Sequence, residues 1–338
     1  KVTWFLVKRE PAPVPETGLS VVEALGGQDT AGYARAIAPR DFRFPADHGA
    51  HPSFRNEWWY FTGNLSTDSG RHFGYQLVIF RIALQPEPIE HVSRWAGNQL
   101  YMGHLALTDP QQERHLYEER FARAAIGLAG AQAQPFRVWL EDWSVSETSD
   151  NRWQLQAAMQ DVRLQLELQA LKPVVLQGEE GLSRKNAEPG NASYYYSVTR
   201  LATQGTVTLD GSEHDVQGLS WLDREWSTSA LADDQAGWDW FSLQLDSGDD
   251  LMFYQLRRKD GGIDPFSAGA LVDTSGWATA LQPDAVSIEV LDTWQSADGV
   301  RYPARWRLRV PEQDIDLTIT PLMTDQELDV AVRYWEGA

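Results

Sequence analysis

The amino-acid sequence predicts an all-β protein made of two antiparallel β-barrels. The first observation is an internal repeat: a pattern of aromatic residues and a turn within 58–77 returns within 238–256. A second pattern, within 152–164, returns at identical spacing within 305–317. Solenoid repeats are much shorter than this separation, so the two matches indicate a duplicated domain. The other observation is that segments with strand character far outnumber helical ones.

The chain length supports two domains. Single hydrophobic cores stop growing at roughly 250 to 300 residues, and this chain has 338. We therefore expect an N-terminal extension over 1–40, a first barrel over 41–210 and a second barrel over 211–338.

The strand predictions rest on β-branched and aromatic residues that recur with a two-residue period. Within 304–310, Trp306, Leu308 and Val310 alternate with arginines, which is typical of an antiparallel strand with one buried face. Asp-Ser-Gly at 68–70 predicts a hairpin turn, because Gly accepts the positive φ of tight turns. The predicted strands are 58–65, 73–84, 136–145, 153–159, 162–168, 206–209, 238–245, 250–257, 286–291, 304–310 and 315–320.

Helical candidates are short and few: 20–24, 31–36 and 118–125. Each half is therefore a meandering antiparallel sheet, which must close or stack to protect its edges, and closure into a barrel is favoured. In the first half the strand at 206–209 completes the unit, whereas the second half ends soon after 330–336. We expect the second barrel to be closed by a segment from elsewhere, for which the apolar stretch 2–7 is the candidate, or to lack one strand.

Composition excludes several classes of function. There are 48 Asp and Glu against 29 Lys and Arg, a net charge of -19 that repels nucleic acid and anionic membranes. The absence of cysteine removes disulfides, thiolate metal sites and cysteine nucleophiles, and is compatible with an oxidising compartment. No apolar run is long enough to predict a transmembrane helix.

The segment 221–226 has the most chemical character. In strand periodicity Trp221, Asp223 and Glu225 share one face, so the two carboxylates could act as an acid and a base. The structural alternative is that one of them forms a buried ion pair with an arginine, because buried charges must be paired. The arginines considered for that pair are Arg200, Arg224 and Arg257.

A second polar cluster surrounds His48 and His51. Imidazoles with a nearby carboxylate can bind zinc, but Gly49 and Pro52 argue against a helical face that would bring these ligands together. We therefore expect neither a metal nor another cofactor. A serine nucleophile elbow, a Walker loop and a dinucleotide-binding fingerprint are also missing from the sequence.

Aromatic residues are abundant, with 15 Trp, 11 Tyr and 12 Phe. They could simply fill two cores, or they could line a cavity for an apolar ligand, as barrels of about eight strands allow. Runs such as 58–61 put aromatic rings on both sides of a barrel wall, and we expect the other barrel to cover the outer ones. The candidate ligand-binding residues are Trp58, Tyr60, Tyr196, Trp221, Trp238 and Trp240.

Several motifs resemble a known family. They are Gly49-Ala50-His51-Pro52, the run 57–65, Ser193-Tyr194-Tyr195-Tyr196-Ser197, the run 221–227, Gly237-Trp238-Asp239-Trp240-Phe241 and Tyr334-Trp335-Glu336-Gly337. From about Phe42 to its end the sequence resembles the AttH-like proteins, often labelled predicted secreted hydrolases and related to carotenoid 1,2-hydratases. The resemblance implies two lipocalin-like, calycin-type barrels, export to the periplasm or the exterior, and an association with lipids or isoprenoids.

The resemblance also implies catalytic positions. Carotenoid hydratases are thought to use a His-x-Trp and a Tyr-x-Asp pair, which align with Tyr194 and Tyr196 and with Trp221 and Asp223. Only Asp223 is retained, and Tyr is a poor acid for protonating an alkene, so carotenoid hydration is not expected. The sequence predicts binding of a small hydrophobic ligand, with two alternatives: an enzyme that uses Asp223, Glu225 and Tyr194, or a surface interaction protein without ligand.

Overall fold

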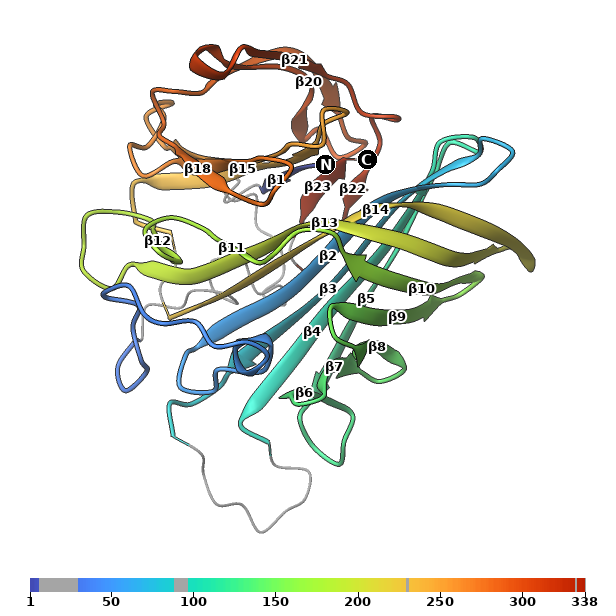
Figure 1. Ribbon diagram of the computed structural model, residues 1–338, viewed down its shortest axis with the longest axis horizontal. Helices are drawn as coiled ribbons and strands as arrows, with labels where there is room; N and C mark the ends of the chain where they lie inside the picture. The colour runs from blue at the N-terminus through green and yellow to red at the C-terminus, as the bar shows by residue number, and fades with distance from the viewer. Residues whose placement is uncertain (6–29, 88–96, 229–230, 332, 338) are drawn as a thin grey trace. The chain divides into compact units, whose positions relative to one another are not determined.

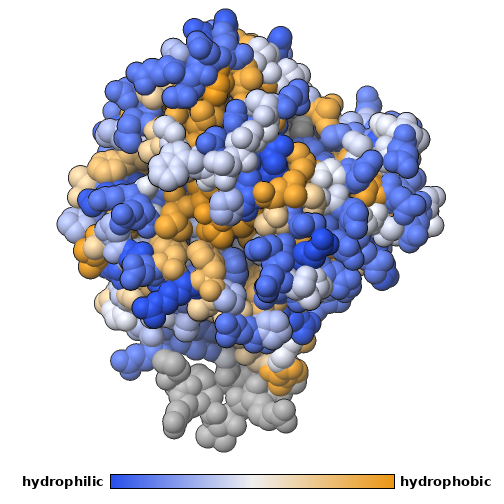
Figure 2. All heavy atoms as spheres, in the orientation of Figure 1, coloured by the Kyte–Doolittle hydropathy of each residue, from blue (hydrophilic) through white to orange (hydrophobic). Residues whose placement is uncertain are grey.

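A computed structural model describes residues 1–5, 30–87, 97–228, 231–331 and 333–337, in two compact units. The first unit is Leu25–Ala230, and the second combines Lys1–Ala24 with Leu231–Ala338. Most of the surface seen in Figure 2 is hydrophilic, as the acid-rich composition predicts, with smaller apolar patches between.

The first unit is one antiparallel sheet that curls into a nearly closed barrel (Figure 1). Along the sheet the strand order is β5-β4-β3-β2-β14-β13-β10-β9-β8-β7-β6, and β11 and β12 pair with β13. The strands are β2 Asn56–Ser66, β3 His72–Ala83, β4 Gln99–Asp109, β5 Arg114–Arg123, β6 Ala129–Ala133, β7 Phe136–Leu140, β8 Trp143–Ser149, β9 Arg152–Met159, β10 Val162–Ala170, β11 Val175–Leu176, β12 Leu182–Arg184, β13 Ala192–Leu209 and β14 Ser212–Ser227.

The two-residue period explains the barrel core. In β10, Val162, Leu164 and Leu166 are buried while the residues between them are exposed. The buried side chains of this and the other strands form one continuous apolar cluster inside the barrel. Asp210 and Gly211 both have positive φ, 51° and 76°, which fits the two-residue hairpin turn that joins β13 to β14.

The second unit has two sheets that share one core. The first sheet has seven strands in the order β18-β17-β16-β15-β1-β23-β22, and the other has the order β19-β20-β21. Phe241 and Phe253 from the larger sheet pack in the same cluster as Trp306 and Leu308 from the smaller one. The strands are β1 Val2–Phe5, β15 Gln235–Gln244, β16 Asp250–Arg258, β17 Ala268–Val272, β18 Ala278–Leu281, β19 Ser287–Gln295, β20 Arg301–Val310, β21 Ile315–Ile319, β22 Glu327–Leu328 and β23 Tyr334–Gly337.

The N-terminal strand closes a gap in the larger sheet, as the sequence predicted. β1 lies between β15 and β23, with Val2 opposite both Phe241 and Gly337. The predicted segment ran to residue 7, and its last two residues lie outside the described part of the chain. The strand therefore pairs with chain segments more than two hundred residues away.

The all-β prediction is confirmed, but the helix predictions at 31–36 and 118–125 are wrong. The first is turn and irregular chain, and the second falls largely in β5, which pairs along its length with β4. Ladder hydrogen bonds outweigh the helix propensity of Glu and Arg there, and charged side chains suit an edge strand. The third candidate, 20–24, lies outside the described residues. Two short 3₁₀ turns are described, η1 Ala46–His48 and η2 Pro311–Gln313. None of the helical segments described is long and apolar enough to cross a membrane.

Two strand predictions had the wrong bounds. The predicted strand 136–145 is the hairpin of β7 and β8, which turns at Glu141, where φ is 56°. The predicted strand 206–209 is the last part of β13. The expected start of the second barrel at 211 also falls at the β13–β14 turn, whereas both strands belong to the first unit. A turn in the sequence marks a hairpin as readily as a domain boundary.

Candidate functional site

Strands β2, β13 and β14 are neighbours in the first unit, and their two faces carry different chemistry. Residues opposite one another in antiparallel strands point to the same side. Asp223 lies opposite Ser197 on β13 and Tyr60 on β2, whereas Arg224 lies opposite Tyr196 and Trp59. We call these sides the Asp223 face and the Arg224 face. The Arg224 face is the inner one, because Trp59 belongs to the barrel core.

Asp223 is a buried carboxyl group held by hydroxyl groups. Tyr195 donates a hydrogen bond to its Oδ1 at 2.9 Å, and Ser197 donates to the same atom at 2.5 Å. Burial raises the pKa of Asp223 to about 7, although the hydrogen bonds from Ser197 and Tyr195 favour the charged form. The nearby Glu225 also raises this pKa. Near neutral pH, Asp223 is therefore present in both protonation states.

Glu225 lies beside Asp223 on the same face and has a cationic partner. Lys185 Nζ is 3.1 Å from its Oε1, and Ser193 donates a short hydrogen bond to the same oxygen. The structural alternative predicted an arginine as the partner of one of the two carboxylates. The partner of Glu225 is instead this lysine, and Arg224 and Arg257 pair with Glu57 and Asp239. Arg224 points to the opposite face from its two acidic neighbours, so the strand period prevents the pairing.

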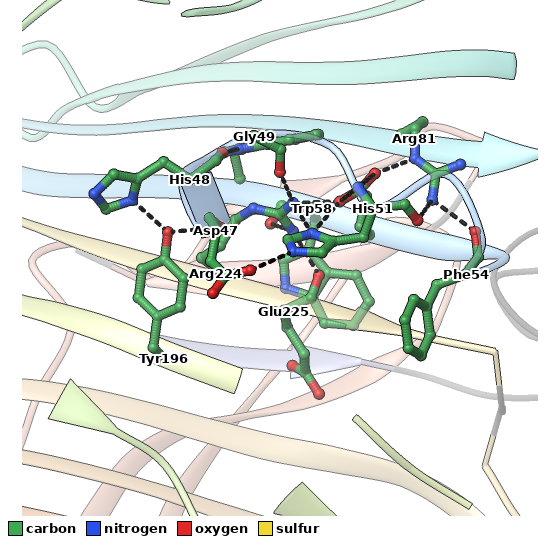
Figure 3. Close-up of polar contacts among 12 residues, drawn as sticks. Asp47, His48, Gly49, His51, Phe54, Trp58, Arg81, Tyr196, Arg224 and Glu225 are labelled. Atoms are coloured by element: carbon green, nitrogen blue, oxygen red, sulfur yellow. Dashed lines mark hydrogen bonds and ion pairs between the residues drawn. The ribbon is translucent and has the colours of Figure 1, made fainter. Parts of the chain in front are cut away.

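The Arg224 face carries a buried charge network, drawn in Figure 3. Arg224 and Arg81 both donate to Glu57, and all three side chains are almost fully buried. Arg224 also donates to the backbone oxygen of Gly49 at 2.6 Å, and its guanidinium lies 4.0 Å from the ring centroid of Trp59. Burial alone would raise the pKa of Glu57, but the two arginines hold it well below its usual range.

His48 and His51, the two histidines considered as metal ligands, lie on this side and contact protein side chains (Figure 3). His48 Nδ1 is 2.6 Å from the hydroxyl oxygen of Tyr196. His51 lies between two carboxylates, with Nε2 at 3.0 Å from Asp47 and Nδ1 at 3.3 Å from Glu57. Across the described ranges, no group of three His, Asp or Glu side chains is placed to hold a metal ion.

The structure brings some of the predicted site residues together and separates others. Trp58, Tyr60 and Trp221 share the Asp223 face with Asp223 and Glu225. Tyr194 and Tyr196 lie on the opposite face, and the hydroxyl group of Tyr194 donates to the backbone oxygen of Ala38 at 2.9 Å. Trp238 and Trp240 belong to β15 in the second unit. Tyr194 therefore does not contact Asp223; the neighbouring Tyr195 does.

Sequence reasoning missed Tyr195 and Ser197 as partners of Asp223, and Glu57 and Arg81 as partners of Arg224. Strand periodicity separates Tyr195 from Tyr194 and Tyr196, which was a usable signal. The register that sets Ser197 opposite Asp223 is fixed by the β13–β14 turn, and a register shift lies between Val198 and Leu201. No local pattern reveals such an irregularity.

The first unit also has an open groove of about 580 Å³ on its outer surface. Its lining is mainly polar and contains none of the aromatic candidates, so the predicted apolar cleft stays a prediction. The lining residues are Asp68, Gln154, Gln165, Leu166, Glu167, Gln204, Gly205, Thr206, Asp215, Val216 and Gln217.

Comparisons with known proteins identify relatives. A family model described as AttH-like matches residues 35–338. A protein from Nitrosomonas europaea described as an AttH is 39% identical with a TM-score of 0.81, over 90% of this chain and 93% of that one. Kievitone hydratase from Nectria haematococca is 13% identical with a TM-score of 0.65, over 95% of this chain and 90% of that one. CghA with Sch210972 is 14% identical with a TM-score of 0.51, over 84% and 80%. No curated protein matches the sequence.

Proposed function

We propose that this chain, which belongs to the AttH-like family, binds a small hydrophobic ligand at the Asp223 face and exchanges a proton with it through Asp223. The observation that carries the proposal is a buried carboxyl group with a pKa of about 7. A general acid or base works best when its pKa is near the working pH, because it can then both give and take a proton. Such pKa values are concentrated at functional sites.

The surroundings of Asp223 suit an apolar ligand. Trp58, Tyr60 and Trp221 share its face, and aromatic rings supply large apolar area with a polar tip for orientation. Tyr195 and Ser197 hold the carboxyl oxygen in one position. A carboxyl group that is held in place transfers a proton along a defined direction, whereas a mobile one does not.

The reaction class that fits is proton transfer at an unsaturated carbon. A carboxyl group that protonates a carbon–carbon double bond leaves a cation and a carboxylate. The cation either adds water, which then gives up one proton, or loses a proton from a neighbouring carbon, and in both cases the carboxylate takes that proton and is restored. These outcomes are hydration and isomerisation. Kievitone hydratase is by name a hydratase, and its likeness to this chain supports the fold alone. An unsaturated lipid or isoprenoid is the substrate class that the family resemblance favours.

We also propose that the protein works outside the cytoplasm, in the periplasm or after secretion. The cysteine-free sequence is compatible with an oxidising compartment, and the family resemblance includes exported proteins. We further infer that the two units derive from a duplicated barrel. Both copies of the first repeat are hairpins, β2–β3 and β15–β16, and both copies of the second are hairpins, β9–β10 and β20–β21.

Native mass spectrometry of the protein purified from its source tests the binding step. We expect a retained hydrophobic molecule, and its incubation with the protein in heavy-oxygen water should give a product that carries the label if the reaction is hydration. Isomerisation gives a product of unchanged mass and a different retention time. A protein that retains no lipid, and binds none from a total lipid extract, contradicts the proposal and favours a surface interaction protein.

The variant Asp223→Asn separates catalysis from binding. The amide keeps the shape of the carboxyl group but cannot exchange a proton, so turnover should fall by about 10²–10⁴ while the ligand is still retained. Asp109→Asn is the matched control, because Asp109 is equally buried, belongs to the same unit and pairs with Arg71 at 2.5 Å. Equal loss of turnover in both variants would assign Asp223 a structural role.

A further inference from the structure

The pair formed by His48 and Tyr196 lies on the Arg224 face and takes no part in the function proposed for Asp223. His48 Nδ1 and the hydroxyl oxygen of Tyr196 are 2.6 Å apart, and Tyr196 is fully buried (Figure 3). The backbone of His48 is also fixed, because Trp59 Nε1 donates to its carbonyl oxygen at 2.8 Å. Hydrogen bonds therefore fix both the backbone of His48 and one nitrogen of its imidazole ring.

The position of the hydrogen atoms follows from the distances. The Tyr196 hydroxyl has one hydrogen and two acceptors, His48 Nδ1 at 2.6 Å and the backbone oxygen of Asp47 at 3.5 Å, and the shorter contact takes it. Burial raises the pKa of Tyr196, so it keeps this hydrogen. Burial and the nearby Arg224 lower the pKa of His48 to about 4, so the imidazole is neutral. A neutral imidazole that accepts at Nδ1 carries its hydrogen on Nε2.

Nε2 of His48 is thus a donor without an acceptor. Among the described residues this nitrogen has no hydrogen-bond partner. Because it is also absent from the fully buried atoms without a partner, it belongs to the 8% of the His48 surface that is exposed. A neutral imidazole whose other nitrogen is held by a hydroxyl group is a pre-oriented donor. Such a donor is suited to a ligand oxygen rather than to an anion.

Aromatic rings surround this donor. The ring centroids of Phe44, Phe136 and Trp153 lie 4.9, 5.7 and 6.0 Å from that of His48, in tilted or edge-on arrangements. Trp153 is buried, and its Nε1 also has no hydrogen-bond partner in the described part of the chain. A buried polar group without a partner is rare in folded proteins and costs about 1–3 kcal/mol, so it calls for an explanation. Phe44 keeps 40% of its surface exposed, so this ring group reaches the surface.

We propose that His48, Trp153 and Phe44 form a second ligand site, for an uncharged aromatic molecule whose carbonyl or hydroxyl oxygen accepts a hydrogen bond from His48 Nε2. The ring arrangement is the one that aromatic pairs prefer. The ligand is uncharged because the charged groups nearby already have partners: Asp47 pairs with Arg40 at 2.9 Å, and Arg224 pairs with Glu57. The site is separate from Asp223, which points to the other side of the sheet.

Nitrogen NMR of the histidine rings tests the proposal on the full chain, which has seven histidines. In the free protein we expect His48 to be neutral at pH 7 with its hydrogen on Nε2. Titration with acetophenone should shift the Nε2 resonance of His48 to saturation, while ethylbenzene, which has no oxygen, should shift it much less. A hydrogen on Nδ1 in the free protein, or equal shifts with the two probes, would overturn the donor role.

Variants assign the binding to the site. His48→Phe keeps a ring of similar shape and should weaken acetophenone binding at least about tenfold, the factor that corresponds to one lost hydrogen bond. Tyr196→Phe removes the hydroxyl group that donates to His48 Nδ1, so a larger fraction of His48 should carry its hydrogen on Nδ1. This variant should therefore also bind acetophenone more weakly. His214→Gln, which alters a histidine near Arg71, should bind acetophenone as the unaltered protein does. Unchanged affinity in both His48→Phe and Tyr196→Phe would refute the site.

Discussion

Asp223→Asn should change the pH dependence of stability in a direction that only a raised pKa explains. The pKa of Asp223 is about 7 in the folded protein and 3.8 in an unfolded chain. Below about pH 4 both states hold the proton, and the group contributes its full stability. As the pH rises toward 7 the unfolded state releases the proton first, so stability is lost progressively until the folded state also releases it.

The size of this loss follows from the two pKa values. A difference of about three pKa units corresponds to about 4 kcal/mol, at about 1.4 kcal/mol per unit. The Asn side chain does not titrate, and its oxygen can still accept from Tyr195 and Ser197. The variant and the unaltered protein should therefore differ little at pH 4. Between pH 4 and pH 8 the variant should gain about 4 kcal/mol of stability relative to the unaltered protein.

Urea unfolding of both proteins at pH 4 and pH 8, followed by tryptophan fluorescence, gives the four free energies of unfolding required. Titrating groups that do not interact with Asp223 are common to the two proteins, so their contribution cancels in the difference. A variant that differs from the unaltered protein by the same amount at both pH values would refute the raised pKa. Such a result would also remove the main support for Asp223 as a proton donor.

Two further predictions concern the parts of the structure that hold the sheets together. Glu57→Gln leaves the buried guanidinium groups of Arg81 and Arg224 without their counter-charge, so it should lower the free energy of unfolding by about 3–5 kcal/mol at pH 7. Because the pKa of Glu57 is lower in the folded protein than in the unfolded chain, this cost should shrink as the pH falls below about 4. Urea unfolding of the variant and the unaltered protein at pH 7 and below pH 4 measures the change. Thr3→Pro puts a residue without an N–H group into a strand that is paired on both sides, so a ladder hydrogen bond is lost and its buried acceptor is left unpaired, which should cost about 1–3 kcal/mol. Thr318→Pro on the edge strand β21 should cost less, and thermal unfolding of both variants measures the difference.

Strand periodicity predicted the parts of the structure that depend on burial of one face. The alternation in β10 and β20 is strict, and both strands lie where the sequence expected them. The segment 118–125 failed because its charged residues have helix propensity, while the hydrogen bonds that make it a strand come from β4, a distant part of the chain. The local sequence predicts which side of a strand is buried, but it does not predict which other strand pairs with it.

The same limit explains what was predicted of the site. Alternation correctly grouped Trp221, Asp223 and Glu225 on one face. It could not supply the partners of Asp223, because these depend on which residues of β13 and β2 lie opposite. Alternation also places Arg224 on the opposite face from Asp223 and Glu225, so it excludes an ion pair with either of them. The sequence already allowed this inference, although Arg224 was still considered there as a partner.

The two faces of β14 bury ionisable groups in different ways. One face pairs a cation with a carboxylate, and the other surrounds a carboxyl group with hydroxyl groups. On one side Glu57 neutralises Arg224, which also donates to the backbone oxygens of Gly49 and Glu225. These bonds fix the strand at the residue between Asp223 and Glu225. On the other side Asp223 is buried with hydroxyl partners and forms no ion pair within the described ranges, so burial raises its pKa. Had Arg224 faced Asp223, the carboxyl group would be permanently charged and unable to donate a proton near neutral pH. The alternation of the strand thus keeps a structural cation close to Asp223 in sequence without pairing it with the carboxyl group.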